Sequence, residues 1–152
     1  MKRMPAVIGF YLAEQENGYL SNWYPASFYL DGVRFENTEQ YIMYRKAVQF
    51  GDTEIAMQIL QSDTPDEVKR LGRQVHGYVG KVWAGIRQLA LFPALMAKFT
   101  QNPALQDQLL STGDALLAEC APRELIWGIG LSLDDPAYSD PTQWRGTNLL
   151  GF

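Results

Sequence analysis

Residues 28–51, which read FYLDGVRFENTEQYIMYRKAVQFG, decide the fold. Two short β-prone runs flank Asp31-Gly32, the pair that best tolerates the positive φ angles of a type I′ turn. The side chains of Asn37-Thr38 can then cap a helix, and neither glycine nor proline interrupts residues 39–50. The stretch therefore predicts a hairpin over 27–36 and a helix from Glu39 to about Gln49, which Gly51 closes.

Helical spacing continues after this stretch. The patterns predict helices over 53–61, 65–75, 81–100 and 103–110, the second of them opened by a capping box at residues 64–67. A strand is expected at 115–119 and one short helix at 142–149. The helix over 81–100 is predicted to be central, kinked at Pro93, with its core face formed by Val82, Ile86, Leu89, Ala90, Leu95, Met96 and Phe99. We expect an α+β, mostly helical single domain over residues 1–152, with a small β-hairpin or sheet.

Composition narrows the class of protein. The chain has 152 residues, of which 47% are apolar and 20% charged, as in a packed globular domain. A formal net charge of -4 opposes a broad electrostatic grip on duplex nucleic acid. Cys120 is the single cysteine and His76 the single histidine, so we predict no disulfide, no metal site and no cofactor. No apolar run approaches the length of a membrane span, and we expect a cytoplasmic protein.

One helix carries the most suggestive pair of residues. Seven positions separate Glu39 from Lys46, close to two turns, so both side chains lie on nearly the same face with Ile42 and Met43. If that face points inward, desolvation raises the pKa of the acid and lowers the pKa of the amine toward values useful in acid–base or Schiff-base chemistry. Alternatively, Glu39 only interacts favourably with the helix dipole, and Lys46 is solvated. Helix position by itself favours this second interpretation.

A second group lies in regions rich in glycine and proline. Glu124 precedes Trp127 by three residues, and glycines follow at 128 and 130, so the acid can lie against an apolar wall. Trp23, Trp127 and Trp144 all occur in such loop-like stretches, where aromatic rings often stack on planar ligands. The alternatives are a surface glutamate and core tryptophans. His76, just past a predicted helix end, is expected to cap that end rather than to catalyse.

Several blocks in order resemble the NADAR (YbiA-like) family. They are Ser21-Asn22-Trp23-Tyr24-Pro25, Asp31-Gly32, Thr38-Glu39-Gln40-Tyr41 with Lys46-Ala47, Trp127-Gly128-Ile129-Gly130, and residues 144–151, WRGTNLLG. The blocks span almost the whole chain. Members of the family are N-glycosidases that cleave the bond between a ribose and a base nitrogen. Some hydrolyse ribosylated intermediates of riboflavin biosynthesis, and others remove ADP-ribose from modified guanine in nucleic acid.

The resemblance implies roles for particular residues. Glu39, Lys46 and Glu124 would be catalytic: Glu39 would stabilise an oxocarbenium-like ribose, Lys46 could attack the anomeric carbon, and Glu124 would orient ribose or water. Substrate-binding positions would be Asn22, Trp23, Trp83, Trp127, Arg145 and Asn148, with Trp144 as a further wall. The site would lie where the helix beginning at Glu39 meets the Trp127 and Trp144 loops. Gln40 and Glu124 depart from the family's usual His and Asp.

Three functions are weighed on these grounds. The first is a metal-independent N-glycosidase that acts on a small ribosylated, phosphorylated metabolite or on ADP-ribosylated guanine in single-stranded nucleic acid. The two departures lean toward the ADP-ribosylated substrate, although the charge of -4 suits a small metabolite better. The second is a non-catalytic module that binds ADP-ribose or a nucleotide, which the same departures favour. The third is a structural domain that binds a partner protein.

Overall fold

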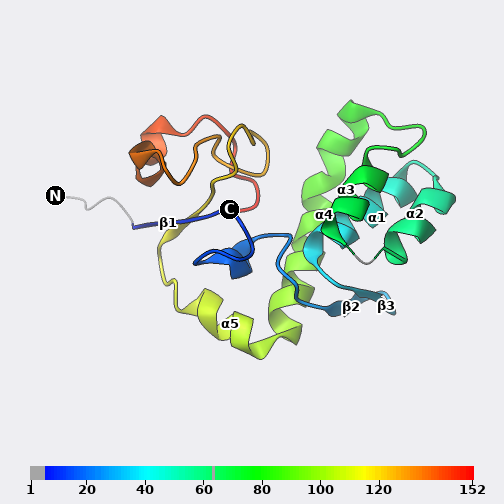
Figure 1. Ribbon diagram of the computed structural model, residues 1–152, viewed down its shortest axis with the longest axis horizontal. Helices are drawn as coiled ribbons and strands as arrows, with labels where there is room; N and C mark the ends of the chain where they lie inside the picture. Colours follow the sequence, from blue (N-terminus) through cyan, green and yellow to red (C-terminus); the bar gives the residue numbers. More distant parts are fainter. Residues whose placement is uncertain (1–5, 63) are drawn as a thin grey trace. The chain divides into compact units, whose positions relative to one another are not determined.

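A computed structural model describes residues 6–62 and 64–152. The contacts divide the chain into two compact units (Figure 1). The helical unit is Pro25–Pro103; the terminal unit joins the N-terminal part of the chain, through Tyr24, to Ala104–Phe152. Five helices and two small sheets are described in these residues, which confirms the mostly helical α+β class.

The helical unit begins with the predicted hairpin. Strand β2 (Phe28–Leu30) pairs antiparallel with β3 (Val33–Phe35). The turn residues Asp31 and Gly32 have φ angles of 52° and 77°, as a type I′ turn requires. Phe28 stands opposite Phe35, and both rings are buried. The hairpin thus presents one apolar face to the helices.

Three helices follow, each with a side-chain cap at its beginning. Helix α1 (Thr38–Gln49) is capped by Asn37, α2 (Thr53–Leu60) by Asp52 and α3 (Pro65–Gly72) by Thr64, which confirms the predicted starts. Helix α3 ends three residues earlier than predicted. Arg73 forms its C-cap, and Val75 is buried beyond the helix in the cluster that α1, α2 and α3 share.

Helix α4 (Gly80–Gln101) runs unbroken through Pro93 and packs against α1. Its predicted core face is partly wrong: Val82, Leu89 and Met96 are 43%, 73% and 51% exposed. Ala90 is buried as predicted, and the rest of the buried face is formed by Trp83, Leu91, Ala94, Ala97 and Lys98. Small alanine side chains allow a close approach of neighbouring helices, which a pattern based on large apolar residues does not register.

The terminal unit contains a parallel pair of strands. β1 (Val7–Phe10) pairs with β4 (Leu116–Glu119), and α5 (Pro103–Leu110) precedes β4. The strand at 116–119 and helix α5 confirm the prediction, whereas β1 was not predicted. A partner distant in sequence leaves no local signal, because a parallel pair needs a long connection.

The predicted helix at 142–149 is wrong. Two short 3-10 helices lie nearby, at Pro136–Ser139 and Pro141–Gln143, and the backbone at Trp144 is already extended. The Asp140 side chain accepts a hydrogen bond from the amide of Thr142, which is typical of a turn. Gly146 lies too close to the backbone of Gly128 for a side chain to fit. Among the described helices, none has both the length and the apolarity of a membrane span.

Candidate functional site

Helix α1 holds Glu39 and Lys46 on one face, as their spacing predicts. The Asn37 side chain accepts from the amide of Gln40 at 2.8 Å, which fixes the helix start and places Glu39 in its first turn. Both side chains are half-buried. Partial burial lowers the pKa of the Lys46 amine, and the charge of Glu39 opposes that shift. The two groups therefore interact electrostatically across two helical turns.

The Lys46 amine is held in a defined position. Its Nζ donates a hydrogen bond to the carbonyl oxygen of Gly72 at 2.8 Å and lies 4.5 Å from the centre of the Tyr78 ring. A Cβ at Gly72 would overlap the sulfur of the flexible Met43 side chain, so a larger residue there would require Met43 to shift. The amine is thus fixed by a backbone acceptor and an aromatic face rather than by a carboxylate at ion-pair distance among the described residues.

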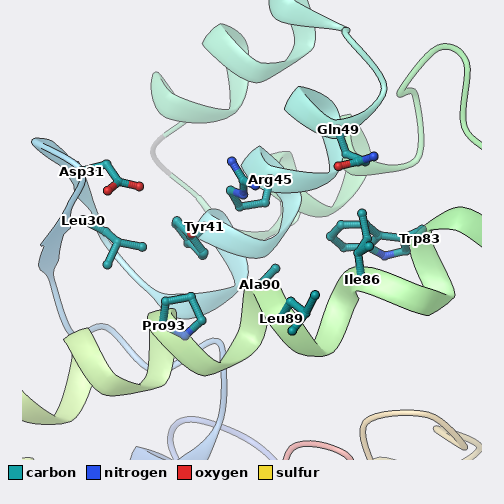
Figure 2. A pocket seen from close by; sticks show the side chains of 10 residues that line it. All are labelled: Leu30, Asp31, Tyr41, Arg45, Gln49, Trp83, Ile86, Leu89, Ala90 and Pro93. Carbon is teal, nitrogen blue, oxygen red and sulfur yellow. The ribbon is translucent and has the colours of Figure 1, made fainter.

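Trp83 lines a pocket in the helical unit (Figure 2). The pocket has a volume of about 470 Å³, which is in the range of small-molecule sites. One wall comes from α1, the other from α4, and residues 30 and 31 of the hairpin lie at one end. Trp83 is 5% exposed, so its buried indole is a fixed surface of the pocket.

Gln40 and His76 have structural partners. The buried Gln40 side chain accepts from the amide of Glu36 at 2.7 Å and donates to the carbonyl of Ile59 at 3.0 Å. His76 does not cap α3: its amide and its Nδ1 contact Oδ2 of Asp52, the N-cap of α2. The departure from the family pattern at Gln40 thus serves the scaffold of the helical unit.

In the terminal unit, Glu124 organises the loop that carries Trp127. Its Oε1 accepts from the amides of Ile126 at 2.9 Å and Trp127 at 3.1 Å. Trp127 is half-buried, and Gly128 behind it is buried. One carboxylate oxygen of Glu124 is therefore committed to the loop, and a catalytic role for Glu124 stays a prediction.

Sequence reasoning missed Glu119, the most buried carboxyl group described in the terminal unit. Glu119 is 8% exposed; Oε1 accepts from the amide of Ala121 at 3.0 Å, and Oε2 is the one buried side-chain polar atom without a hydrogen-bond partner among the described residues. Burial raises the pKa of this carboxyl to about 7. The carboxyl fills the space where a Cβ of Gly128 would stand. An acid inside the apolar strand at 116–119 was the signal that could have found it.

The other predicted binding residues of the terminal unit differ in exposure. Asn148 is fully buried, with Oδ1 accepting from the amide of Glu119 at 3.1 Å and Nδ2 donating to the carbonyl of Leu117 at 2.8 Å. Arg145 is exposed. Asn148 thus supports β4, and its predicted substrate contact stays a prediction.

Two tryptophans of this unit, Trp23 and Trp144, are both half-buried but differ in their contacts. Trp144 donates from Nε1 to the carbonyl of Tyr138 at 2.8 Å and packs against the core cluster of the terminal unit. Asn22 is buried and Trp23 half-buried, with the amide of Trp23 bonded to the Ser21 hydroxyl. The Trp144 ring is therefore tied to the core by a hydrogen bond and by packing, while part of the surface of both tryptophans remains accessible.

The predicted site residues fall into two sets. Glu39, Lys46 and Trp83 belong to the helical unit. The terminal unit holds Asn22, Trp23, Glu124, Trp127, Arg145 and Asn148. The structure shows the geometry of each set within its own unit, and a single site built from both stays a prediction.

Comparison with known proteins identifies the class. The model of the NADAR domain family matches residues 9–152. N-glycosidase R617 of Acanthamoeba polyphaga mimivirus is 35% identical over 136 residues, which is 86% of this chain and 80% of that protein. The riboflavin biosynthesis protein VVA0006 of Vibrio vulnificus is 31% identical over 127 residues, covering 84% of this chain and 34% of that protein.

A solved structure agrees with these relatives. The solution structure of YbiA from Escherichia coli matches with a TM-score of 0.79 and 27% identity, covering 99% of this chain and 81% of that one. The same protein is called N-glycosidase YbiA and is 29% identical over 146 residues. The fold and these relatives define an N-glycosidase. The chain belongs to the NADAR domain family, which confirms the resemblance drawn from its motifs.

Proposed function

We propose that this N-glycosidase cleaves the bond between a ribose and a base nitrogen in a ribosylated, phosphorylated substrate, with Glu39 and Lys46 as its catalytic pair. The observation that carries the proposal is the Lys46 amine, which is half-buried, anchored on Gly72 and within electrostatic reach of Glu39. Such an amine loses its proton more readily than a solvated lysine does, and the neutral amine is the nucleophilic form.

The reaction balances with water as the only co-reactant. The Lys46 nitrogen attacks the anomeric carbon as the bond to the base nitrogen breaks, and Glu39 stabilises the positive charge that develops on the ribose. The departing base takes up the proton that the attacking amine loses as its bond to carbon forms. Ring opening then gives an imine between Lys46 and the sugar, and water hydrolyses the imine to release the phosphorylated sugar and restore the amine. If the adduct does not form, water attacks the same carbon directly.

The substrate is either a ribosylaminopyrimidine phosphate or ADP-ribosylated guanine. The name of the Vibrio vulnificus relative supports the first, and the small net negative charge supports it also. Purified protein should be incubated with both substrates side by side, and the released base and sugar measured by mass spectrometry. Release from neither substrate would overturn the proposal.

Substitution of the acid tests its role. Glu39→Gln should lower kcat at least ~100-fold, because the charge that stabilises the transition state is lost. The matched control is Glu54→Gln, which also removes an acid from the first turn of a helix, α2. If Glu39 has only a structural role, Glu39→Gln and Glu54→Gln should each lose about 0.3–1 kcal/mol of stability and keep full activity. Full activity of Glu39→Gln would therefore contradict the catalytic assignment.

The residues of the terminal unit are tested separately. We propose that Trp23 and Trp127 contact the substrate through their accessible surfaces and that Arg145 donates hydrogen bonds to its hydroxyl groups. Single alanine substitutions at these positions should raise KM more than they lower kcat. Unchanged kinetics in any one variant would remove that residue from the proposal.

A further inference from the structure

The pocket between α1 and α4 has two chemically different walls. Tyr41, Arg45 and Gln49 follow one another at four-residue spacing along α1 and form the polar wall. Ile86, Ala90 and Pro93 of α4 lie opposite and form the apolar wall. Figure 2 shows Arg45 near the middle of the α1 wall, with Asp31 toward one end and Gln49 and Trp83 toward the other. We call this pocket the α1–α4 groove.

Arg45 has no protein partner in the groove. Among residues 6–62 and 64–152, its half-buried guanidinium takes part in no hydrogen bond and no ion pair, and Asp31 lies beyond ion-pair distance. The charges of Arg45 and Asp31 both reach the Tyr41 phenol, so the three groups share one environment. A guanidinium presents five donors and no acceptor, so this wall offers hydrogen bonds that the protein itself does not use.

From this arrangement we infer that the α1–α4 groove binds the phosphomonoester end of a sugar phosphate and that Arg45 is the phosphate ligand. A guanidinium pairs with phosphate oxygens through two parallel hydrogen bonds. The apolar wall of α4 and the Trp83 indole give a surface for the uncharged part of the ligand. The groove carries one cation and one carboxylate, which suits a single phosphoryl group beside Arg45 and sugar hydroxyls toward Asp31.

The groove and the proposed catalytic pair share helix α1, although neither Glu39 nor Lys46 lines the groove. Arg45 and Lys46 are consecutive residues of α1, so their side chains leave the helix about 100° apart. Lys46 and Gln49 are one turn apart, and Gln49 belongs to the same end of the groove as Trp83. If the sugar phosphate on Arg45 is the substrate of the proposed reaction, its sugar has to pass Gln49 to reach Lys46. Only this link to Lys46 rests on the proposed function, since binding of a sugar phosphate in the groove needs no turnover.

Binding without catalysis tests the groove. Calorimetric titration with ribose 5-phosphate should show binding to the wild type, a Kd about 10- to 100-fold higher for Arg45→Gln, and partial recovery for Arg45→Lys, which keeps the charge but not the fork. The control Arg73→Gln, an exposed arginine of the same unit, should bind as the wild type does. Ribose without phosphate should bind weakly and equally to all four proteins.

Two results would overturn the inference. Equal affinity of the wild type and Arg45→Gln for ribose 5-phosphate would remove Arg45 as the phosphate ligand. Tighter binding of ADP-ribose than of ribose 5-phosphate, with the same dependence on Arg45, would contradict the assignment to a phosphomonoester. Because the titration measures no turnover, an inactive wild type that still binds ribose 5-phosphate through Arg45 would refute the proposed function and leave the groove supported.

Discussion

Glu119 makes the stability of this protein depend on pH in a predictable direction. Its carboxyl is buried against the backbone of Gly128, with one oxygen on the amide of Ala121 and the other without a partner among the described residues. Burial is the main cause that raises its pKa from 4.5 to about 7, and the nearby Glu124 carboxylate adds to the shift. The folded protein thus holds a proton that the unfolded chain releases near pH 4.5.

The sign and size of the effect follow from this difference. Because the folded state binds the extra proton, the free energy of unfolding is largest below about pH 4.5 with respect to this group and falls as the pH rises through 7. Each pKa unit corresponds to about 1.4 kcal/mol, so full ionisation costs roughly 3 kcal/mol. Between pH 5 and pH 8, Glu119 should therefore remove roughly 2 to 3 kcal/mol of stability.

Glu119→Gln isolates this contribution. The amide keeps the shape of the protonated acid and its acceptor for the Ala121 amide, but it does not titrate. Urea unfolding at pH 5 and pH 8 should show that the variant loses roughly 2 to 3 kcal/mol less than the wild type over that interval. Glu14→Gln, which removes an exposed carboxylate of the same unit, should follow the wild type. Parallel curves for wild type and Glu119→Gln would refute the reasoning.

Three further outcomes are expected. Lys46→Ala should abolish the protein–sugar adduct that borohydride traps in the wild type, because no amine remains to form the imine; an adduct of unchanged yield, measured by mass spectrometry, would exclude Lys46 as the nucleophile. Asn148→Ala should cost about 1–3 kcal/mol in urea unfolding, since it leaves the amide of Glu119 and the carbonyl of Leu117 buried without their bonds. Gly72→Ala should slow trapping of the lysine adduct, because its Cβ overlaps the Met43 side chain and the carbonyl that accepts from Lys46 shifts unless Met43 moves instead; unchanged kinetics would show that Met43 alone absorbs the overlap.

Local signals predicted the helical unit well because its elements begin and end on residues with defined local chemistry. The turn at Asp31-Gly32 and the caps at Asn37 and Thr64 are each satisfied within a few residues of the chain. The terminal unit depends instead on distant partners. Strand β1 forms by pairing with β4, more than one hundred residues away in the sequence. No pattern within residues 7–10 predicts that pairing.

The sequence predicted part of the candidate site in the helical unit. The spacing of Glu39 and Lys46 was sufficient to place them on one face, because helical periodicity alone decides that. It did not predict the acceptor at Gly72, which comes from the end of another helix. The sequence did not predict a role for Arg45 for a related reason. A single arginine on a helix is usually a solvated charge, and only the packing of α4 encloses the space beside it.

The two acids of the terminal unit show why residue type in a motif is a weaker guide than environment. Glu124 stands in the motif beside Trp127, yet one of its oxygens binds two loop amides and is committed to local structure. Glu119 stands outside the motif but carries the strongly raised pKa, because desolvation is determined by what surrounds a carboxyl and not by its distance in sequence from a tryptophan. The Trp127 loop rests on both acids: Glu124 bonds its amides, and Glu119 packs behind Gly128. Ionisation of Glu119 near neutral pH therefore places a buried charge directly behind this loop, and activity that depends on Trp127 should decline over the same pH range as stability.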